Sequence, residues 1–207
     1  PRVSITAKLV ANLLTVSRVD RILTMDLHAP QIQGFFDIPF DHLTAYPVFF
    51  KHFANIENLV VVSPDVGGIK RAREIANTLG LPLVVIDKRR QQANQAEAMN
   101  VIGNVEGKNC LVVDDLLDTG GTFLAASTAL KKHGALKIYG AVTHALLSGN
   151  SIENINNSVL EELIVTDTIN LENRNLGEKI KIKSVSEIFA EAIIRIHKNE
   201  SISKLFD

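Results

Sequence analysis

The strongest constraint on the fold is a series of short, largely uninterrupted apolar runs separated by amphipathic segments. Strands that are apolar on both faces are typical of a parallel sheet covered by helices on both sides. Helical periodicity between the runs predicts helices over residues 68–79 and 121–133. The pattern therefore predicts a doubly wound α/β domain over residues 46–184. The expected strands cover residues 58–63, 83–86, 109–114, 138–146 and 163–166.

Further elements are expected towards both ends of the chain. A helix is predicted to begin near Ser4, followed by a strand over residues 21–26, and a second helix opens with Pro47. A last helix is predicted over residues 186–198. Its apolar face is formed by Ile188, Phe189, Ala192, Ile193 and Ile196.

Composition excludes several classes of protein. The 207 residues are 46% hydrophobic and 22% charged, which is typical of a globular protein and excludes a disordered or fibrous one. The 22 basic and 23 acidic side chains give a net charge of −1, which argues against a nucleic-acid partner. No apolar run approaches the roughly 20 residues of a membrane span. The single Cys110 excludes an internal disulfide and is typical of a reducing, cytoplasmic setting.

The most informative motif begins where the strand over residues 109–114 ends. Asp114 and Asp115 are followed by an Asp-Thr-Gly-Gly-Thr loop at the start of a helix. Backbone N–H groups at a helix start bind phosphate, and two glycines allow it to approach closely. We expect both carboxylates to face the same crevice and to accept hydrogen bonds from sugar hydroxyls. The motif thus predicts a sugar-phosphate site, for which ribose 5-phosphate fits. The structural alternative is that Asp118 only caps the helix.

Two further motifs combine acidic residues with strand ends. Asp65 lies in a Ser-Pro-Asp-Val-Gly-Gly segment that could hold a pyrophosphate and its Mg²⁺, or form only a turn. Asp26 and His28, two residues apart on an extended segment, are expected on one face, where they would share a metal or a phosphate or be merely structural. Asp37 and Asp41 follow. The other histidines form no cluster with ligand spacing, which argues against zinc.

A polar segment over residues 88–99 fits neither a helix nor a strand, and we interpret it as a mobile flap that leads to a hairpin turning at residues 106–107. It opens with three cations, Lys88, Arg89 and Arg90. Cations on a mobile segment over a phosphate crevice can stabilise a charged transition state. The alternative is a solvated run of charge.

Together, these four segments resemble the ribose-phosphate pyrophosphokinase family, which has the type I phosphoribosyltransferase fold. The similarity extends over essentially the whole chain. The segments that carry it are residues 26–39, 63–68, 87–90 and 112–122, with a similar tail at 196–201. The resemblance implies two domains of the same kind. Residues 46–184 would be the C-terminal domain, and residues 1–45 with 185–207 a remnant of the N-terminal one.

The resemblance also implies an activity. The family transfers the β,γ-pyrophosphoryl group of ATP to the C1 hydroxyl of ribose 5-phosphate, which gives phosphoribosyl pyrophosphate and AMP for nucleotide biosynthesis. It requires Mg²⁺ and forms homo-oligomers, with a hexamer implied. Metal contacts carry over to His28 and Asp65, with Asp26, Asp37 and Asp41 as weaker candidates.

Catalytic and binding roles carry over in the same way. Lys88 and Arg90 would lie on the catalytic flap, and Arg90 would also contact ribose 5-phosphate. The remaining ribose 5-phosphate ligands implied by the resemblance are Asp114, Asp115, Asp118, Thr119, Gly120, Gly121 and Thr122.

Two departures from the family pattern matter. The segment that binds adenine in the family has no counterpart here, so we expect this chain alone to be a weak catalyst or inactive. We also expect Ile22, Leu23 and Met25 to be partly uncovered and to drive self-association. Pro30 stands where the family loop usually carries a polar residue.

Two other readings remain. One is a non-catalytic subunit that associates with the active synthase. The other is a nucleobase phosphoribosyltransferase. The latter shares the Asp-Asp and Asp-Thr-Gly-Gly-Thr motif but has no need of Lys88, Arg90 or the motif containing His28.

Overall fold

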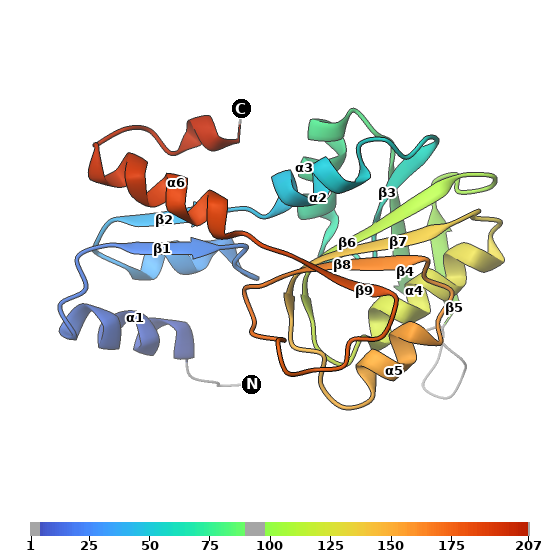
Figure 1. The fold of residues 1–207 in the computed structure, drawn as a ribbon, viewed down its shortest axis with the longest axis horizontal. Coiled ribbons are helices and arrows are strands. Elements are labelled where there is room, and N and C mark those ends of the chain that lie inside the picture. Colours follow the sequence, from blue (N-terminus) through green and yellow to red (C-terminus); the bar gives the residue numbers. More distant parts are fainter. Residues whose placement is uncertain (1–4, 90–97, 207) are drawn as a thin grey trace. The chain divides into compact units, whose positions relative to one another are not determined.

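The computed structural model describes residues 5–89 and 98–206, and the contacts divide the chain between Ala45 and Tyr46 into two compact units (Figure 1). Residues 185–207 fall within the second unit by their contacts. That they form one domain remnant with residues 1–45 stays a prediction.

The second unit is built on a seven-stranded sheet with the order β5-β4-β3-β6-β7-β8-β9. Every neighbouring pair is parallel except β4 and β5. This confirms the predicted doubly wound, mainly parallel α/β sheet. The strands are β3 (Leu59–Ser63), β4 (Leu83–Arg89), β5 (Ala98–Ile102), β6 (Asn109–Leu117), β7 (Ile138–Ala145), β8 (Glu162–Thr166) and β9 (Ile180–Lys183).

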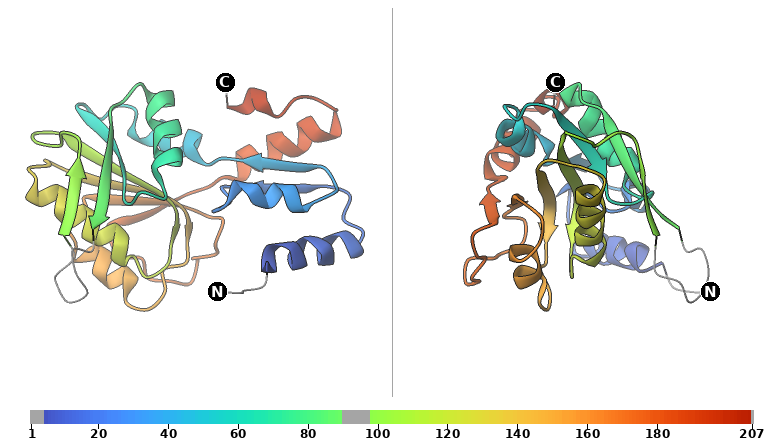
Figure 2. Two further views of the ribbon diagram at one scale, coloured as in Figure 1. Left: turned by 180° about the vertical axis from the view of Figure 1, so that it is seen from behind. Right: turned by 90° about the vertical axis from the view of Figure 1, so that its right-hand side faces the viewer.

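Helices cover both faces of this sheet (Figures 1 and 2). Because parallel crossovers are right-handed, the connection from β3 to β4 and the oppositely directed one from β6 to β7 place their helices on opposite faces. All five residues of β3 are buried, as expected for a central strand. The helices of this unit are α2 (Tyr46–Phe53), α3 (Ile69–Leu79), α4 (Gly121–Lys132), α5 (Ser151–Asn156) and α6 (Ser186–His197), with a short 3₁₀ helix, η2 (Ser203–Leu205).

The strand order creates a switch point between β3 and β6. The chain leaves β3 towards β4 on one side and leaves β6 towards β7 on the other, although β3 and β6 are hydrogen-bonded neighbours. The crevice beyond the carboxyl ends of such a strand pair is where open α/β sheets bind ligands.

The first unit contains a helix and a two-stranded parallel sheet. Its elements are α1 (Thr6–Val16), β1 (Ile22–Met25), η1 (Pro30–Phe35) and β2 (Phe40–Leu43). Pro30 occupies the first position of η1, where its missing N–H costs nothing. In α1 only Ala11 is buried, and Leu9 and Leu13 are each 58% exposed. The expected uncovered surface therefore lies mainly on α1. Ile22 and Leu23 are half-buried, and the expectation for Met25 was wrong because it is buried.

The hairpin expected around residues 106–107 was also wrong. β5 pairs antiparallel with β4, from Val85 opposite Ile102 to Arg89 opposite Ala98. The turn at residues 106–107 exists, but it joins β5 to β6, which are not neighbours. Residues 90–97, which include most of the expected flap, lie outside the described residues. Strand structure also extends through residues 88–89 and 98–99, which were expected to have none.

A polar cluster joins α2 to the strands β8 and β9. Glu162 Oε2 lies 2.8 Å from His52 Nε2, and Glu162 Oε1 lies 2.5 Å from Lys181 Nζ. Burial alone would raise the pKa of Glu162, but hydrogen bonds and charge from Lys181 and His52 outweigh it, and the pKa is lowered.

Within the described ranges, no helix has the length and apolar character needed to cross a membrane.

Candidate functional site

The loop between β6 and α4 has the geometry of a phosphate cradle. Gly120 precedes α4 in a left-handed conformation with φ of +78°, which a residue with a side chain rarely adopts. No side chain of a described residue caps this helix, and its first internal bond runs from Leu124 N–H to Gly120 C=O. The preceding N–H groups of the first turn are therefore directed outwards, and a Cβ on Gly121 would meet no atom within 4 Å. An anion can approach this backbone closely.

A pocket of about 220 Å³ lies over this loop at the switch point of the sheet. Asp65 enters it from the segment after β3, and Asp114 from β6. The predicted phosphate loop and these two carboxylates are therefore brought together as the sequence indicated. The pocket is lined by Asp65, Asp114, Leu116, Leu117, Asp118, Thr119, Gly120, Gly121, Thr122 and Phe123.

The two adjacent carboxylates do not share this pocket. β6 continues to Leu117, three residues beyond its predicted end, so both acids lie within the strand. Asp114 lines the pocket, whereas Asp115 does not and is only 2% exposed. The expectation that both carboxylates face one crevice was therefore wrong.

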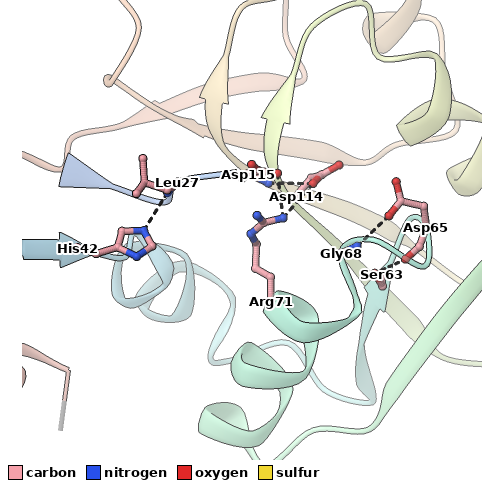
Figure 3. Close-up of polar contacts among 8 residues, drawn as sticks. All are labelled: Leu27, His42, Ser63, Asp65, Gly68, Arg71, Asp114 and Asp115. Atoms are coloured by element: carbon pink, nitrogen blue, oxygen red, sulfur yellow. Dashed lines mark hydrogen bonds and ion pairs between the residues drawn. The ribbon is translucent and has the colours of Figure 1, made fainter. Parts of the chain in front are cut away.

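Both carboxylates contact an arginine that the sequence analysis did not single out (Figure 3). Arg71 Nη1 lies 2.9 Å from Asp115 Oδ1 and 3.3 Å from Asp114 Oδ1. Burial and the adjacent Asp115 carboxyl raise the pKa of Asp114 to about 7, and the charge of Arg71 opposes this rise. The sequence did offer a signal for Arg71, because this residue lies in the first turn of the helix that follows the Asp-Val-Gly-Gly motif.

The segment around Asp65 forms a tight turn into α3 (Figure 3). The Gly68 N–H donates to Asp65 Oδ1 at 2.8 Å, and Ser63 Oγ donates to the Asp65 carbonyl at 2.7 Å. A Cβ on Gly68 would lie 3.0 Å from Ser63 Oγ, which explains the glycine. The turn expected as the structural alternative thus uses one carboxylate oxygen of Asp65, and the same side chain also lines the pocket.

The end of β6, directly before the phosphate loop, is hydrogen-bonded to the segment that follows β7. The Leu146 N–H donates to the Leu117 carbonyl at 2.9 Å. The guanidinium of Arg174 in turn donates to the carbonyl oxygen of Leu146 at 2.6 Å and to that of Leu147. Sequence reasoning missed Arg174, because a contact between loops 28 residues apart leaves no local pattern.

Asp26 and His28 do not lie on an extended segment, on which they were expected to share one face. Asp26 has a φ of +42°, so the alternation of an extended strand does not apply, and that part of the argument was wrong. Asp26 Oδ2 accepts a hydrogen bond from the Ala45 N–H at 3.0 Å, and His28 is exposed.

The remaining metal candidates of the first unit are Asp37 and Asp41. Asp41 pairs with Arg21 at 2.5 Å, and Asp37 is exposed. In the described ranges 5–89 and 98–206, no group of three or more His, Cys, Asp or Glu side chains is placed to hold a metal ion. The Mg²⁺ ligands stay a prediction.

The flap cations are described only in part. Lys88 belongs to β4, where its backbone lies opposite Met99 of β5. Arg90 lies outside the described residues. The catalytic roles expected of both stay predictions.

Comparison with known proteins agrees with this geometry. Residues 89–207 match the family described as the phosphoribosyl synthetase-associated domain. The chain is 59% identical over 210 residues to a ribose-phosphate pyrophosphokinase from Chlorobaculum tepidum, a match that covers 100% of this chain and 65% of the relative. It is 50% identical over 207 residues to the Bacillus subtilis protein of the same name, covering 99% of this chain and 65% of that one.

Solved structures show the same relationship. A phosphoribosylpyrophosphate synthetase from Mycobacterium smegmatis superposes with a TM-score of 0.87 at 36% identity, covering 96% of this chain and 66% of that one. An APRTase from Giardia lamblia matches 58% of this chain and 75% of its own with a TM-score of 0.50 at 20% identity, which shows a shared fold alone. The chain spans about 65% of the length of the curated relatives named above. It belongs to the ribose-phosphate pyrophosphokinase family.

Proposed function

We propose that this chain carries the ribose 5-phosphate site of an enzyme that transfers the β,γ-pyrophosphoryl group of ATP to the C1 hydroxyl of ribose 5-phosphate. One observation carries the proposal. The pocket at the switch point joins an uncapped helix start at Gly120 to a carboxylate, Asp114, on the neighbouring strand end. The helix start suits a phosphate, and the carboxylate suits sugar hydroxyls.

Binding follows from the chemistry of these groups. The N–H groups of residues 119–122 donate to the 5-phosphate, and the α4 dipole favours its negative charge. Asp114 accepts hydrogen bonds from the ribose hydroxyls when it is ionised, and its pKa of about 7 makes this acceptance strengthen as pH rises through neutrality. The site thus fixes the sugar at two ends and orients the C1 hydroxyl.

The transfer forms a bond between the C1 oxygen and the β-phosphorus of ATP. The bond from that phosphorus to the oxygen shared with the α-phosphate breaks, AMP leaves, and the hydroxyl proton is released. Charge on the transferred group spreads over phosphoryl oxygens, so positioned cations lower the barrier. We assign that role to Lys88 and Arg90 on the grounds of family resemblance.

Mg²⁺ fits the acidic side of this pocket. It is held through oxygen ligands, commonly one or two carboxylates together with substrate phosphates. Asp65 lines the pocket and is half-buried. When bound, the ion would neutralise phosphate charge. His28 stays a metal contact that the family resemblance alone implies. We further expect a homo-oligomer in the cytoplasm, as the family implies.

The test uses this chain joined to the part of the Chlorobaculum tepidum relative that it does not cover. The purified chimera is incubated with ATP, Mg²⁺ and ribose 5-phosphate, and AMP and phosphoribosyl pyrophosphate are followed chromatographically. We expect both products in equal amounts. A folded chimera without turnover contradicts the proposal and favours the non-catalytic associated subunit. Consumption of added phosphoribosyl pyrophosphate with a nucleobase, without AMP formation from ATP, favours the phosphoribosyltransferase.

A further inference from the structure

Arg71 connects the two sides of the switch point. It lies in the first turn of α3, directly after the Asp65 turn, and its guanidinium reaches Asp114 and Asp115 on β6 (Figure 3). We propose that Arg71 is a positioning residue for ribose 5-phosphate, which favours the charged form of the Asp114 carboxylate and orients it for the sugar hydroxyls. The inference rests on the proposed function and names the residue that prepares its sugar-binding group.

The geometry gives one nitrogen two partners. Arg71 Nη1 contacts one oxygen of each carboxylate, at 2.9 Å for Asp115 and 3.3 Å for Asp114. The Asp114 Oδ1 atom also accepts the Asp115 N–H at 2.9 Å. Two protein donors therefore fix the orientation of the Asp114 side chain before any ligand is bound.

Burial divides the roles of the two acids. The Asp115 side chain is 3% exposed, so its charge needs the arginine as a partner. The Asp114 side chain is 24% exposed and lines the pocket, so it can contact a ligand while it keeps its contact with Arg71. Asp115 thus acts as the buried anchor of the guanidinium, and Asp114 as its ligand-facing partner.

The charges set the direction of the effect. Two neighbouring carboxylates share one cation, and burial together with the Asp115 carboxyl already raises the pKa of Asp114 to about 7. An opposite charge at this distance typically lowers a carboxyl pKa by about 1–3 units, so removal of Arg71 raises it further. Among the described residues, the other titratable side chains that line this pocket are Asp65 and Asp118, and His144 lies on the adjoining strand β7. All three are unchanged in the variants.

The experiment is a calorimetric titration of this chain with ribose 5-phosphate between pH 6 and 9. The variant Arg71→Gln keeps the side-chain length and removes the charge, and Arg71→Lys restores the charge. The matched control is Arg73→Gln, an exposed arginine two residues along the same helix. The phosphate of the ligand titrates near pH 6, but it does so equally for all the proteins.

We expect Arg71→Gln to weaken binding about fivefold or more at pH 7, because a one-unit rise in pKa reduces the ionised fraction from about half to about a tenth. Binding should recover towards the wild-type value by pH 9. Arg71→Lys should restore the wild-type midpoint at least in part, and the control should match wild type. Without ligand, a ¹³C carboxyl titration followed by NMR should show a higher midpoint for Asp114 in Arg71→Gln.

Three results would overturn the inference. They are wild-type affinity in Arg71→Gln, an equal loss at every pH, and an unchanged Asp114 midpoint. Failure of the wild-type chain to bind ribose 5-phosphate would instead refute the proposed function, and the carboxyl titration would still decide whether Arg71 controls Asp114.

Discussion

Replacement of Gly140 by alanine should destabilise the second unit by overpacking. Gly140 lies on β7, and a Cβ there would come within 2.6 Å of Leu163 Cδ1 and 2.9 Å of Phe123 Cζ. Real Cβ atoms essentially never lie within 3.0 Å of such neighbours, so a packed side chain must move. Overpacking of this kind typically costs about 1–3 kcal/mol. Because Phe123 also lines the pocket, we expect ribose 5-phosphate to bind more weakly as well.

The assay is thermal and urea unfolding followed by circular dichroism. For a domain of this size, a loss of about 2 kcal/mol lowers Tm by roughly 4–8 °C. Gly34→Ala is the control, since a Cβ at Gly34 would meet no atom within 4 Å. In the double variant Gly140→Ala with Leu163→Val, the total cost should fall below the sum of the single costs. An unchanged Tm for Gly140→Ala alone would refute the packing argument.

Three further predictions follow from the site and from the edge of the sheet. In the chimera of full length, Lys88→Ala should lower kcat on the order of 10²–10³-fold and leave KM nearly unchanged; a raised KM with normal kcat would make Lys88 a substrate clamp. Arg174→Ala should weaken ribose 5-phosphate binding measured by calorimetry, because the loop behind the phosphate cradle loses its two carbonyl contacts, and unchanged affinity would contradict this. The pKa of Glu162 is lowered because Lys181 and His52 outweigh the effect of burial. The ionised carboxylate therefore stabilises the fold above its unfolded-state pKa near 4.5, and this stabilisation is lost as pH falls through the folded-state pKa. Urea unfolding should therefore show Glu162→Gln less stable than wild type at pH 7 and a smaller difference near pH 3, and a constant difference would contradict the linkage.

The sequence predicted the sheet and the phosphate loop because their determinants are local. The buried strand before Asp114 is a run of apolar residues, and the left-handed conformation at Gly120 is one that residues with a side chain rarely adopt. Their meeting with Asp65 also follows from sequence, because the carboxyl ends of parallel strands lie at one edge of a sheet.

Long-range features could not be predicted in this way. The role of Arg71 depends on β3 and β6 being neighbours, although 43 residues separate Arg71 from Asp114. The burial of Asp115 depends on β6 extending past the acids, which its pairing with β7 produces. The pairing of β5 with β4 rather than β6 was missed because the turn at residues 106–107 resembles a hairpin turn.

The most direct test of the account is calorimetric titration of this chain with ribose 5-phosphate, with and without the paired substitutions Asp114→Ala and Asp118→Ala. The control pair, Glu172→Ala with Glu178→Ala, removes two exposed carboxylates that do not line the pocket. A hydrogen bond to a charged group contributes about 1.5–3 kcal/mol, so we expect the wild-type and control chains to bind and the double variant to bind at least about tenfold more weakly. Equal affinity in all three proteins would contradict the assignment of the ribose 5-phosphate site to this pocket.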